Sequence, residues 1–268
     1  MDRKEYTEAN RIAWNESASV HKRLVFDKLL KNFQRPSYSC LDDIERRIIS
    51  KIGLEGKNVA QLCCNNGREL LSIKNLGAER CVGFDISDDF IEQARQLANA
   101  GGIACEFVQT DVYDIPTDYD ANFDLVYISV GALGWMPDLE KFFRVIKRLL
   151  KPFGWLFVYE THPMLDMFES DCKDDPPKLE HSYFREKPYI EDTGLDYYGH
   201  TTYKSSPTYW FHHKMSDIID ACLKNRLELK SFQEYDHDIT NEFAHFEKLA
   251  VKPPLSYTLT AQLTSPPP

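Results

Sequence analysis

The fold of this chain is decided by residues 58–85, which read NVAQLCCNNGRELLSIKNLGAERCVGFD. The apolar run Val59–Cys64 predicts a buried strand, and the segment Arg68–Asn75, with apolar residues at helical spacing, predicts a helix. A second apolar run, Arg80–Asp85, predicts another strand. Two buried strands joined by a helix are typical of a βαβ unit, whose strands are parallel.

The alternation of strands and helices continues as far as residue 160. Further strands are predicted at Ala104–Gln109, Phe123–Ser129 and Trp155–Glu160. Helices are predicted from Ser87 or Asp88 to about Ala100, and over Asp138–Leu150. This alternation predicts an α/β fold with a mostly parallel sheet that helices cover on both faces.

Three further segments surround this predicted core, which we assign to residues 51–160. Residues 1–50 contain two helical stripes separated by Pro36 and predict a helical N-terminal cap. Residues 161–214 are rich in aromatic and charged side chains and predict an insert or lid after the fifth strand. Residues 215–268 predict a helix and two strands, which complete a sheet of seven strands.

Composition and charge disfavour several classes of partner. The net charge is −10, whereas nucleic-acid binding needs a basic face, so a tRNA or DNA substrate is not expected. No apolar stretch approaches the roughly 20 residues that span a bilayer, and no secretory signal is recognisable, so no membrane partner is expected. The seven cysteines are scattered, which favours reduced thiols in a cytoplasmic protein. The oligomeric state is left open.

Candidate ligand-binding residues follow the predicted strands. In an open α/β sheet, ligands bind beyond the carboxyl ends of the strands, where the strand order reverses. The first predicted strand leads into Gln61–Gly67 and the second into Asp85-Ile86. The third leads into Thr110-Asp111-Val112 and the fourth into Ser129-Val130-Gly131.

The residues at these strand ends favour one cofactor over another. An acid at Asp85, about 20 residues beyond the first turn, can accept hydrogen bonds from ribose hydroxyls, which NAD and S-adenosylmethionine (SAM) both present. A dinucleotide needs a glycine-rich turn for its pyrophosphate, but this turn supplies only Gly67. SAM has no phosphate, and Asp111 fits its adenine amino group. A nicotinamide-dependent oxidoreductase is therefore the weaker alternative.

In this order and spacing, the motifs of residues 58–160 resemble those of the class I, Rossmann-like SAM-dependent methyltransferases. The resemblance is carried by Val59–Gly67, Asp85, Asp111-Val112 and the stretch LLKPFGWLFV at 149–158. It implies a Rossmann-like fold and an enzyme that transfers the methyl group of SAM to a small molecule, releasing S-adenosylhomocysteine. The cofactor-binding residues that it implies are Gln61, Cys63, Asn65, Gly67, Asp85, Ile86, Asp111, Val112 and Ser129.

The N-terminal segment extends this resemblance. Asn10–Asn15, with His21 beyond it, is similar to the cap of some small bacterial members of the family. In those proteins the segment folds over the cofactor, which implies further contacts from Tyr6, Trp14 and His21.

The first turn departs from the family pattern. Gln61 stands where the family usually has an acid, and Cys63 and Asn65 stand where it has glycines. Gln61 can still bond to the methionine ammonium, although it lacks the charge. These departures motivate an alternative function, a SAM-binding regulator or scaffold that transfers no methyl group.

Candidate catalytic residues are three histidines. His162 follows the fifth predicted strand and is the first choice for a general base, because an unperturbed imidazole titrates near neutrality. A structural role for His162 is an equal alternative. His212 and His213 are the second choice; adjacent histidines rarely chelate one ion, so no metal is predicted. The aromatic side chains of the insert favour a flat or apolar acceptor.

One further motif is interpreted as a loop. Residues 175–178, which read DPPK, are similar to the Asp-Pro-Pro-aromatic signature of enzymes that methylate amino groups of nucleic acids. That signature follows strand four directly and ends in an aromatic residue, whereas this segment lies in the insert and ends in Lys178.

Overall fold

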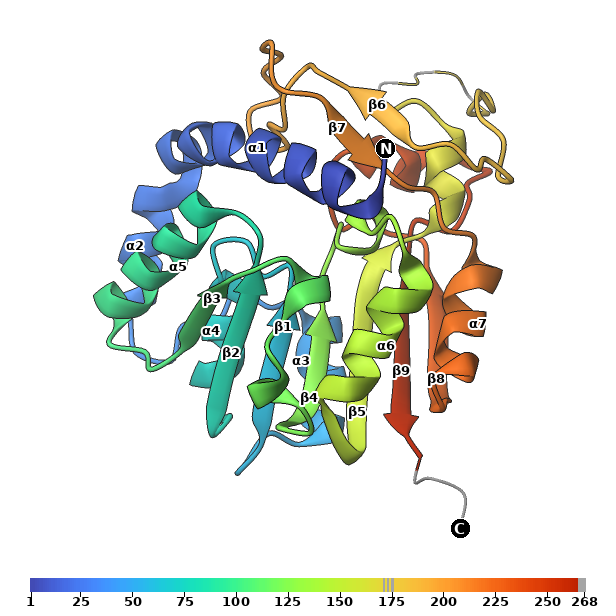
Figure 1. Ribbon diagram of the computed structural model, residues 1–268. Helices are drawn as coiled ribbons and strands as arrows, with labels where there is room; N and C mark the ends of the chain where they lie inside the picture. The colour runs from blue at the N-terminus through green and yellow to red at the C-terminus, as the bar shows by residue number, and fades with distance from the viewer. Residues whose placement is uncertain (171, 173, 175, 265–268) are drawn as a thin grey trace.

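A seven-stranded sheet forms the centre of the molecule (Figure 1). The computed structural model describes residues 1–170, 172, 174 and 176–264. The strand order is β3-β2-β1-β4-β5-β9-β8, and only β9 runs antiparallel to its neighbours. The strands are β1 Asn58–Leu62, β2 Arg80–Asp85, β3 Glu106–Gln109, β4 Phe123–Ile128, β5 Leu150–Thr161, β8 Leu227–Tyr235 and β9 Ser256–Leu263. The predicted fold class, a Rossmann-like and mostly parallel sheet of seven strands, is confirmed.

The sheet is covered by helices on both faces, as the buried strand patterns require. The helices are α3 Asp43–Ile52, α4 Arg68–Asn75, α5 Asp88–Gly101, α6 Leu139–Leu149 and α7 Met215–Lys224. One apolar cluster joins the sheet to α3, α4 and α5, and a second joins it to α6 and α7. Side-chain caps fix two of the helix starts: the Ser87 hydroxyl accepts the Phe90 amide in α5, and the Asp138 carboxylate accepts the Lys141 amide in α6.

The N-terminal cap is a long helix laid across the carboxyl ends of the strands (Figure 1). It consists of α1, Arg3–His21, a π-helical turn at Lys22–Phe26, and α2, Asp27–Phe33. The helix ends before Pro36, as the sequence pattern predicts. Phe26, Leu29 and Phe33 anchor its second half in the apolar cluster beside α5. The first half, α1, is therefore the part that faces the strand ends.

The insert lies beside α1, above the same end of the sheet (Figure 1). It contains a 3-10 helix at Pro163–Met167 and two strands, β6, Tyr189–Glu191, and β7, Thr208–Trp210, which form an antiparallel ribbon. A small apolar cluster formed by residues of 165–168 and 243–255 lies nearby in the fold. Asp175 lies outside the described residues, so the interpretation of residues 175–178 as a loop stays a prediction.

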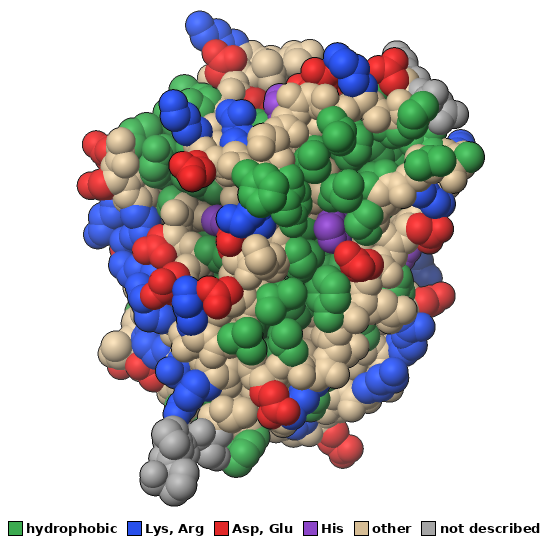
Figure 2. Space-filling model, turned by 90° about the vertical axis from the view of Figure 1, so that its right-hand side faces the viewer, with side chains coloured by type: hydrophobic (Ala, Val, Ile, Leu, Met, Phe, Trp, Pro, Cys, Tyr) green, Lys and Arg blue, Asp and Glu red, His purple; other side chains and the backbone are tan. Residues whose placement is uncertain are grey.

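The outer face beyond α7 and β8 mixes apolar and charged side chains (Figure 2). Leu223 of α7, Phe232 of β8 and Ile190 of β6 are exposed apolar residues. Over the described ranges, no helix has both the length and the apolar character that crossing a bilayer requires.

Candidate active site

A cavity of about 510 Å³ lies at the carboxyl ends of the parallel strands, beneath α1 and the insert. Its volume falls within the range of about 300–1,000 Å³ that is typical of small-molecule sites. The strand order reverses between β1 and β4, so the cavity occupies the position at which α/β sheets bind their ligands.

Most of the residues predicted at the strand ends line this cavity. They come from the turns that follow four parallel strands and from α1, and they are Cys63, Asn65, Asp85, Ile86, Asp111, Val112, Ser129 and Trp14. Gly67 and Gln61 lie behind this surface. A side chain at Gly67 would overlap the Phe107 ring, so the glycine serves close packing of the turn.

The turn after β1 has an unusual backbone. Cys63 and Asn65 have φ angles of 55° and 50°, in the left-handed region that favours glycine, and Gly67 has 71°. This conformation explains why glycines suit these positions. A left-handed residue with a side chain costs roughly 1 kcal/mol, and less for Asn than for Cys. The strained turn carries Cys63 and Asn65 into the wall of the cavity.

Asp85, at the end of β2, is held by this turn. One carboxylate oxygen accepts the Asn65 amide at 2.7 Å and the other accepts the Ser87 amide at 2.9 Å. Burial raises the pKa of Asp85 to about 6, against the lowering effect of these hydrogen bonds. Each oxygen keeps one lone pair, so the carboxylate can accept two more hydrogen bonds from a ligand.

Asp111 ties the strand ends to the cap. One oxygen accepts hydrogen bonds from the Arg3 guanidinium at 3.0 Å and from the Thr7 hydroxyl at 2.8 Å. The other oxygen accepts the Tyr113 amide at 3.0 Å and keeps a free lone pair. Asp111 therefore anchors α1 and can still accept one bond from an amino group in the cavity.

A charged pair at the start of α4 was not predicted from the sequence. Arg68 and Glu69 both line the cavity, with the guanidinium Nε 2.5 Å from a Glu69 oxygen. The guanidinium also donates to the Tyr198 hydroxyl at 2.6 Å. Arg68 directly follows Gly67, so its position after the first turn was the available signal.

One face of α1 forms part of the cavity wall. Thr7, Asn10 and Trp14 line the cavity, and their spacing of three and four residues places them on the same side of the helix. Because Trp14 was a predicted cofactor contact, helical spacing could have identified Thr7 and Asn10 as further cavity residues on the same face of the helix. Tyr6 lies outside this wall and packs between Tyr209 and Phe211.

Three tryptophans meet across the cavity. The Trp135 ring makes edge-on contacts with Trp14, at a centroid distance of 5.3 Å, and with Trp210, at 5.0 Å. All three line the cavity, and they come from α1, from the loop after β4 and from β7. These two contacts join the cap, the core and the insert.

Glu160, at the end of β5, fixes the loop that carries Trp135. Its carboxylate is buried and accepts the backbone amides of Gly131 at 2.6 Å, Ala132 at 2.7 Å and Leu133 at 3.0 Å. Burial raises the pKa of Glu160 to about 7, although these hydrogen bonds oppose the shift. Gly131 and Ala132 line the cavity, so Glu160 positions part of its wall.

The three candidate catalytic histidines do not line the cavity. His162 accepts the Met164 amide with Nδ1, and its Nε2 lies 3.0 Å from Glu234 on the edge strand β8. His213 lies 2.8 Å from the Met136 carbonyl through Nε2, and His212 lies 2.8 Å from Asp166 through Nδ1. Burial lowers the pKa of His162 and of His213. This arrangement gives no support to a general base at these positions.

His21 has a structural environment as well. Its Nε2 lies 2.7 Å from the Leu195 carbonyl, and its ring packs against Tyr197 and Tyr198 of the insert. Burial lowers the pKa of His21 to about 4, so the ring is neutral and donates to this carbonyl. His21 thus joins the end of α1 to the insert.

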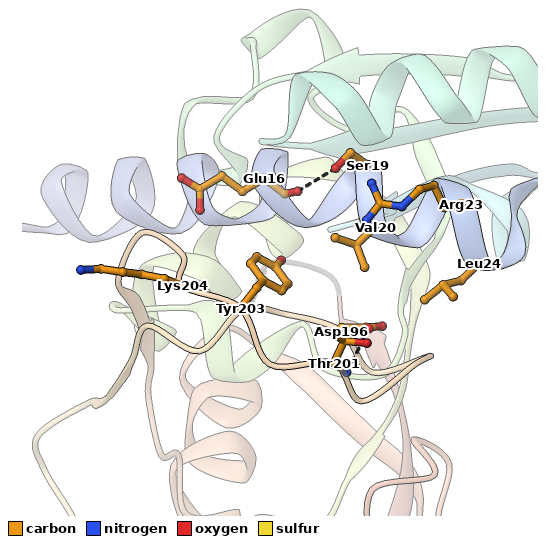
Figure 3. A pocket seen from close by; sticks show the side chains of 9 residues that line it. All are labelled: Glu16, Ser19, Val20, Arg23, Leu24, Asp196, Thr201, Tyr203 and Lys204. Carbon is orange, nitrogen blue, oxygen red and sulfur yellow. Dashed lines mark hydrogen bonds between the residues drawn. The ribbon is translucent and has the colours of Figure 1, made fainter.

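A second hollow, of about 470 Å³, lies on the outer side of α1 (Figure 3). The end of α1, the following π-helical turn and the insert loop 196–204 form its walls, with Glu16, Arg23, Tyr203 and Lys204 around it. Close by, the Ser206 amide and hydroxyl donate to Glu16 at 2.8 and 2.6 Å. No strand-end residue reaches this hollow among those that the structure describes, which separates it from the candidate active site.

Comparison with known proteins finds a family model that matches the centre of the chain. Residues 59–154 match the family model described as a methyltransferase domain. The chain is 31% identical over 51% of its length to a sterol 24-C-methyltransferase of Aspergillus fumigatus, and 33% identical over 39% to a tRNA U34 carboxymethyltransferase of Campylobacter hominis. Each match spans 36% of the relative, so the chain covers about a third of these proteins.

Longer matches exist at lower identity. An uncharacterized protein of Haemophilus influenzae is 22% identical over 91% of this chain and 96% of its own length. A SAM-dependent methyltransferase from Mesorhizobium loti has a TM-score of 0.61 at 19% identity, covering 81% of this chain and 97% of its own. One from Clostridium acetobutylicum has a TM-score of 0.59 at 14% identity and covers 94% and 99%. These structures share the fold of this chain.

Proposed function

We propose that this chain, whose residues 59–154 match the methyltransferase-domain model, is a class I, Rossmann-like SAM-dependent methyltransferase and transfers the methyl group of SAM to a small-molecule acceptor. The observation that carries the proposal is the cavity at the strand ends, with the Asp85 carboxylate in its wall and α1 and the insert above it. A covered cavity of about 510 Å³ suits a cofactor with a small acceptor better than it suits a folded nucleic acid or protein.

The residues present fit the cofactor. Asp85 offers two free lone pairs to a ribose, and Asp111 offers one to an adenine amino group. The Gln61 amide donates to Ser129 at 2.8 Å, while its buried carbonyl oxygen has no hydrogen-bond partner among the described residues. Gln61 thus holds Ser129, which lines the cavity, and Arg68 is the matching cation for the methionine carboxylate. The turn after β1 does not need a glycine-rich phosphate-binding loop, because SAM carries no phosphate.

When bound, SAM supplies an electrophilic methyl group on a sulfonium sulfur, which is already a good donor. The protein's own residues then have to orient the acceptor and exclude water. Trp14 from α1 and Trp135 from the loop after β4 form the wall between the strand ends and the insert. The acceptor loses a proton only if its nucleophilic atom carries one. Among the described histidines, His181 alone lines the cavity, and its Nε2 lies 2.9 Å from Glu169.

The direct test uses SAM labelled on its methyl group. The protein is incubated with fractions of a cell extract, one of small molecules, one of tRNA and one of protein, and label is followed in each. We expect transfer to the small-molecule fraction, with S-adenosylhomocysteine as the second product. Label in tRNA or protein would overturn the small-molecule acceptor. Binding of SAM without product in any fraction would favour the regulator or scaffold.

A further inference from the structure

The part of the cavity under the insert has a strongly biased charge. Over the whole cavity, the lining residues that the structure describes include seven carboxylates but only one Lys or Arg, which is Arg68. Arg68 is paired with Glu69, and Asp111 is paired with Arg3. Asp85 lies at the end of β2, and the remaining acids are Asp166, Glu169, Glu191 and Glu242.

These four acids differ in whether their side chains already have hydrogen-bond or ion-pair partners in the protein. Asp166 bonds to His212 and receives the Trp210 indole N–H at 3.3 Å, and Glu169 lies 2.9 Å from His181. Glu191 and Glu242 have no ion-pair partner among the residues that the structure describes, and solvent reaches both. Although the Glu242 side chain keeps contact with solvent, partial desolvation by nearby protein atoms and the Asp238 and Glu191 carboxylates raise its pKa, while His200 opposes the shift.

The excess of carboxylates disfavours an anionic acceptor, and the placement of the described side chains disfavours a metal ion. An anionic acceptor such as a diphosphate would meet like charges in this part of the cavity, which is unfavourable. A bridging metal ion would remove that conflict. The described His, Cys, Asp and Glu residues, however, contain no group of three placed to hold one.

Aromatic rings complete the environment. Trp210 and Tyr189 line the cavity and both bond to Asp166, and the Trp135 ring contacts Trp210. Indole and phenol faces attract cations, most strongly where water is excluded. The Tyr189 ring already has one such contact, because the Arg185 guanidinium lies 4.1 Å from its centroid.

From this combination we infer that the methyl acceptor is a cationic amine with an aromatic or apolar body, whose positive charge lies between Glu191, Glu242 and the Trp210 ring. The inference rests on the proposed function, since it assigns the acceptor side of the same cavity. It concerns recognition of the charge, which can lie on the methylated atom or elsewhere in the acceptor.

The test measures binding to protein saturated with S-adenosylhomocysteine, by calorimetry. The probes are benzyltrimethylammonium, which is cationic, N,N-dimethylbenzamide, which is neutral, and phenylacetate, which is anionic. We expect the cation to bind at least about tenfold more tightly than either of the others. The double variant E191Q/E242Q should lose at least about tenfold in affinity for the cation. The control variant E186Q removes the same charge from an exposed acid of the insert outside the cavity, and should change that affinity by less than about twofold.

The outcomes distinguish failure of the cationic acceptor from failure of the proposed function. Equal affinities for the three probes, absence of binding by all of them, or an unchanged affinity in E191Q/E242Q would overturn the cationic acceptor. Binding of S-adenosylhomocysteine is measured first and separately on each variant. Its absence in the unmodified protein would overturn the proposed function itself, whereas its retention in E191Q/E242Q shows that the variant is folded.

Discussion

The Asn10 carboxamide of α1 pairs with the backbone of Tyr209 in β7 in the manner of an adjacent strand. Its Nδ2 donates to the Tyr209 carbonyl at 3.0 Å, and its Oδ1 accepts the Tyr209 amide at 2.8 Å. Asn10 is buried and lines the cavity. A single side chain thus joins two segments that are 199 residues apart and that together cover the proposed cofactor site.

Replacement of Asn10 should loosen this cover. Asn10→Ala leaves the Tyr209 amide and carbonyl without their partner, at a cost of about 1–3 kcal/mol that falls on the closed arrangement. We expect S-adenosylhomocysteine to dissociate at least about tenfold faster, as measured by stopped-flow fluorescence. Ser19→Ala, also on α1 but bonded only within its own helix, is the control. An unchanged dissociation rate would mean that α1 does not limit ligand release.

Asp85 should be required for cofactor binding. In Asp85→Ala the two acceptors for a ribose disappear, and in Asp85→Asn one of them becomes a donor. We expect calorimetry to show no measurable SAM binding by Asp85→Ala and a loss of about 100-fold or more in Asp85→Asn. Asp89→Asn, an exposed acid in the first turn of α5, is the matched control. Near-normal affinity in Asp85→Ala would remove the ribose site from the proposal.

Cofactor affinity should depend on pH through Asp85. Because burial raises its pKa to about 6, this carboxyl is protonated more readily in the free protein than an ordinary aspartate. Ribose hydroxyls donate to the ionised form, so affinity is full well above pH 6 and decreases as the pH falls through that value. The expected decrease is about tenfold per pH unit below the pKa.

Calorimetric titrations with S-adenosylhomocysteine between pH 5 and 8 would measure this dependence. The Asp85→Asn variant, which cannot titrate at this position, should show a flatter profile. The same slope in that variant would assign the titration to another group, such as Glu160, which positions part of the cavity wall.

Gly134 should not tolerate a side chain. A Cβ at this position would overlap the indole of Trp210, and the Gly134 carbonyl accepts the Phe211 amide at 2.6 Å. Gly134→Ala therefore separates the loop after β4 from β7, and we expect a loss of about 1–3 kcal/mol in the free energy of unfolding. In the double variant with Trp210→Leu the overlap is relieved, so the two effects should be non-additive in denaturant titrations. Additive losses would contradict this contact.

Glu160 should stabilise the loop through its charge distribution. In the wild type, backbone N–H groups donate to both carboxylate oxygens of Glu160. In Glu160→Gln one of these oxygens is replaced by an NH₂ group, which cannot accept. We expect urea unfolding at pH 8 to show a loss of about 2 kcal/mol in the free energy of unfolding. The wild-type acid has a raised pKa, so its native form binds more protons than its unfolded form. Its contribution to stability therefore decreases as the pH rises from about 4.5 to about 7.

The Gln variant cannot titrate at this position and should lack that part of the pH slope. Glu228→Gln, on the exposed face of β8, is the control and should change stability by less than about 0.5 kcal/mol. A pH slope equal to that of the wild type would show that Glu160 is not the titrating group.

The sequence predicted the sheet well because each strand is a local pattern. Val59–Cys64 and Arg80–Asp85 read as buried runs, and the turns after them had to meet at one edge once the strands were parallel. Asp85 and Asp111 could be placed in this way. The Ser87 cap was also readable, since a hydroxyl before a periodic segment is a local signal.

The acceptor side could not be predicted in the same way. His162 follows β5 directly, but its side chain turns toward Glu234 and Tyr257 at the antiparallel edge of the sheet, and no local pattern sets that direction. Glu191 and Glu242 belong to segments without regular periodicity, and their approach to one cavity depends on long-range packing. The pairing of Asn10 with Tyr209 also depends on long-range packing and could not be predicted from a local pattern.

The meeting of Trp14, Trp135 and Trp210 has a practical consequence. The chain has four tryptophans, and these three line the cavity, so most of its indole emission originates beside the proposed ligands. Trp155, on β5, is the only indole remote from them. The protein thus contains its own optical reporter: quenching or a spectral shift would record filling of the cavity, and Trp14 would record displacement of α1, without any attached dye.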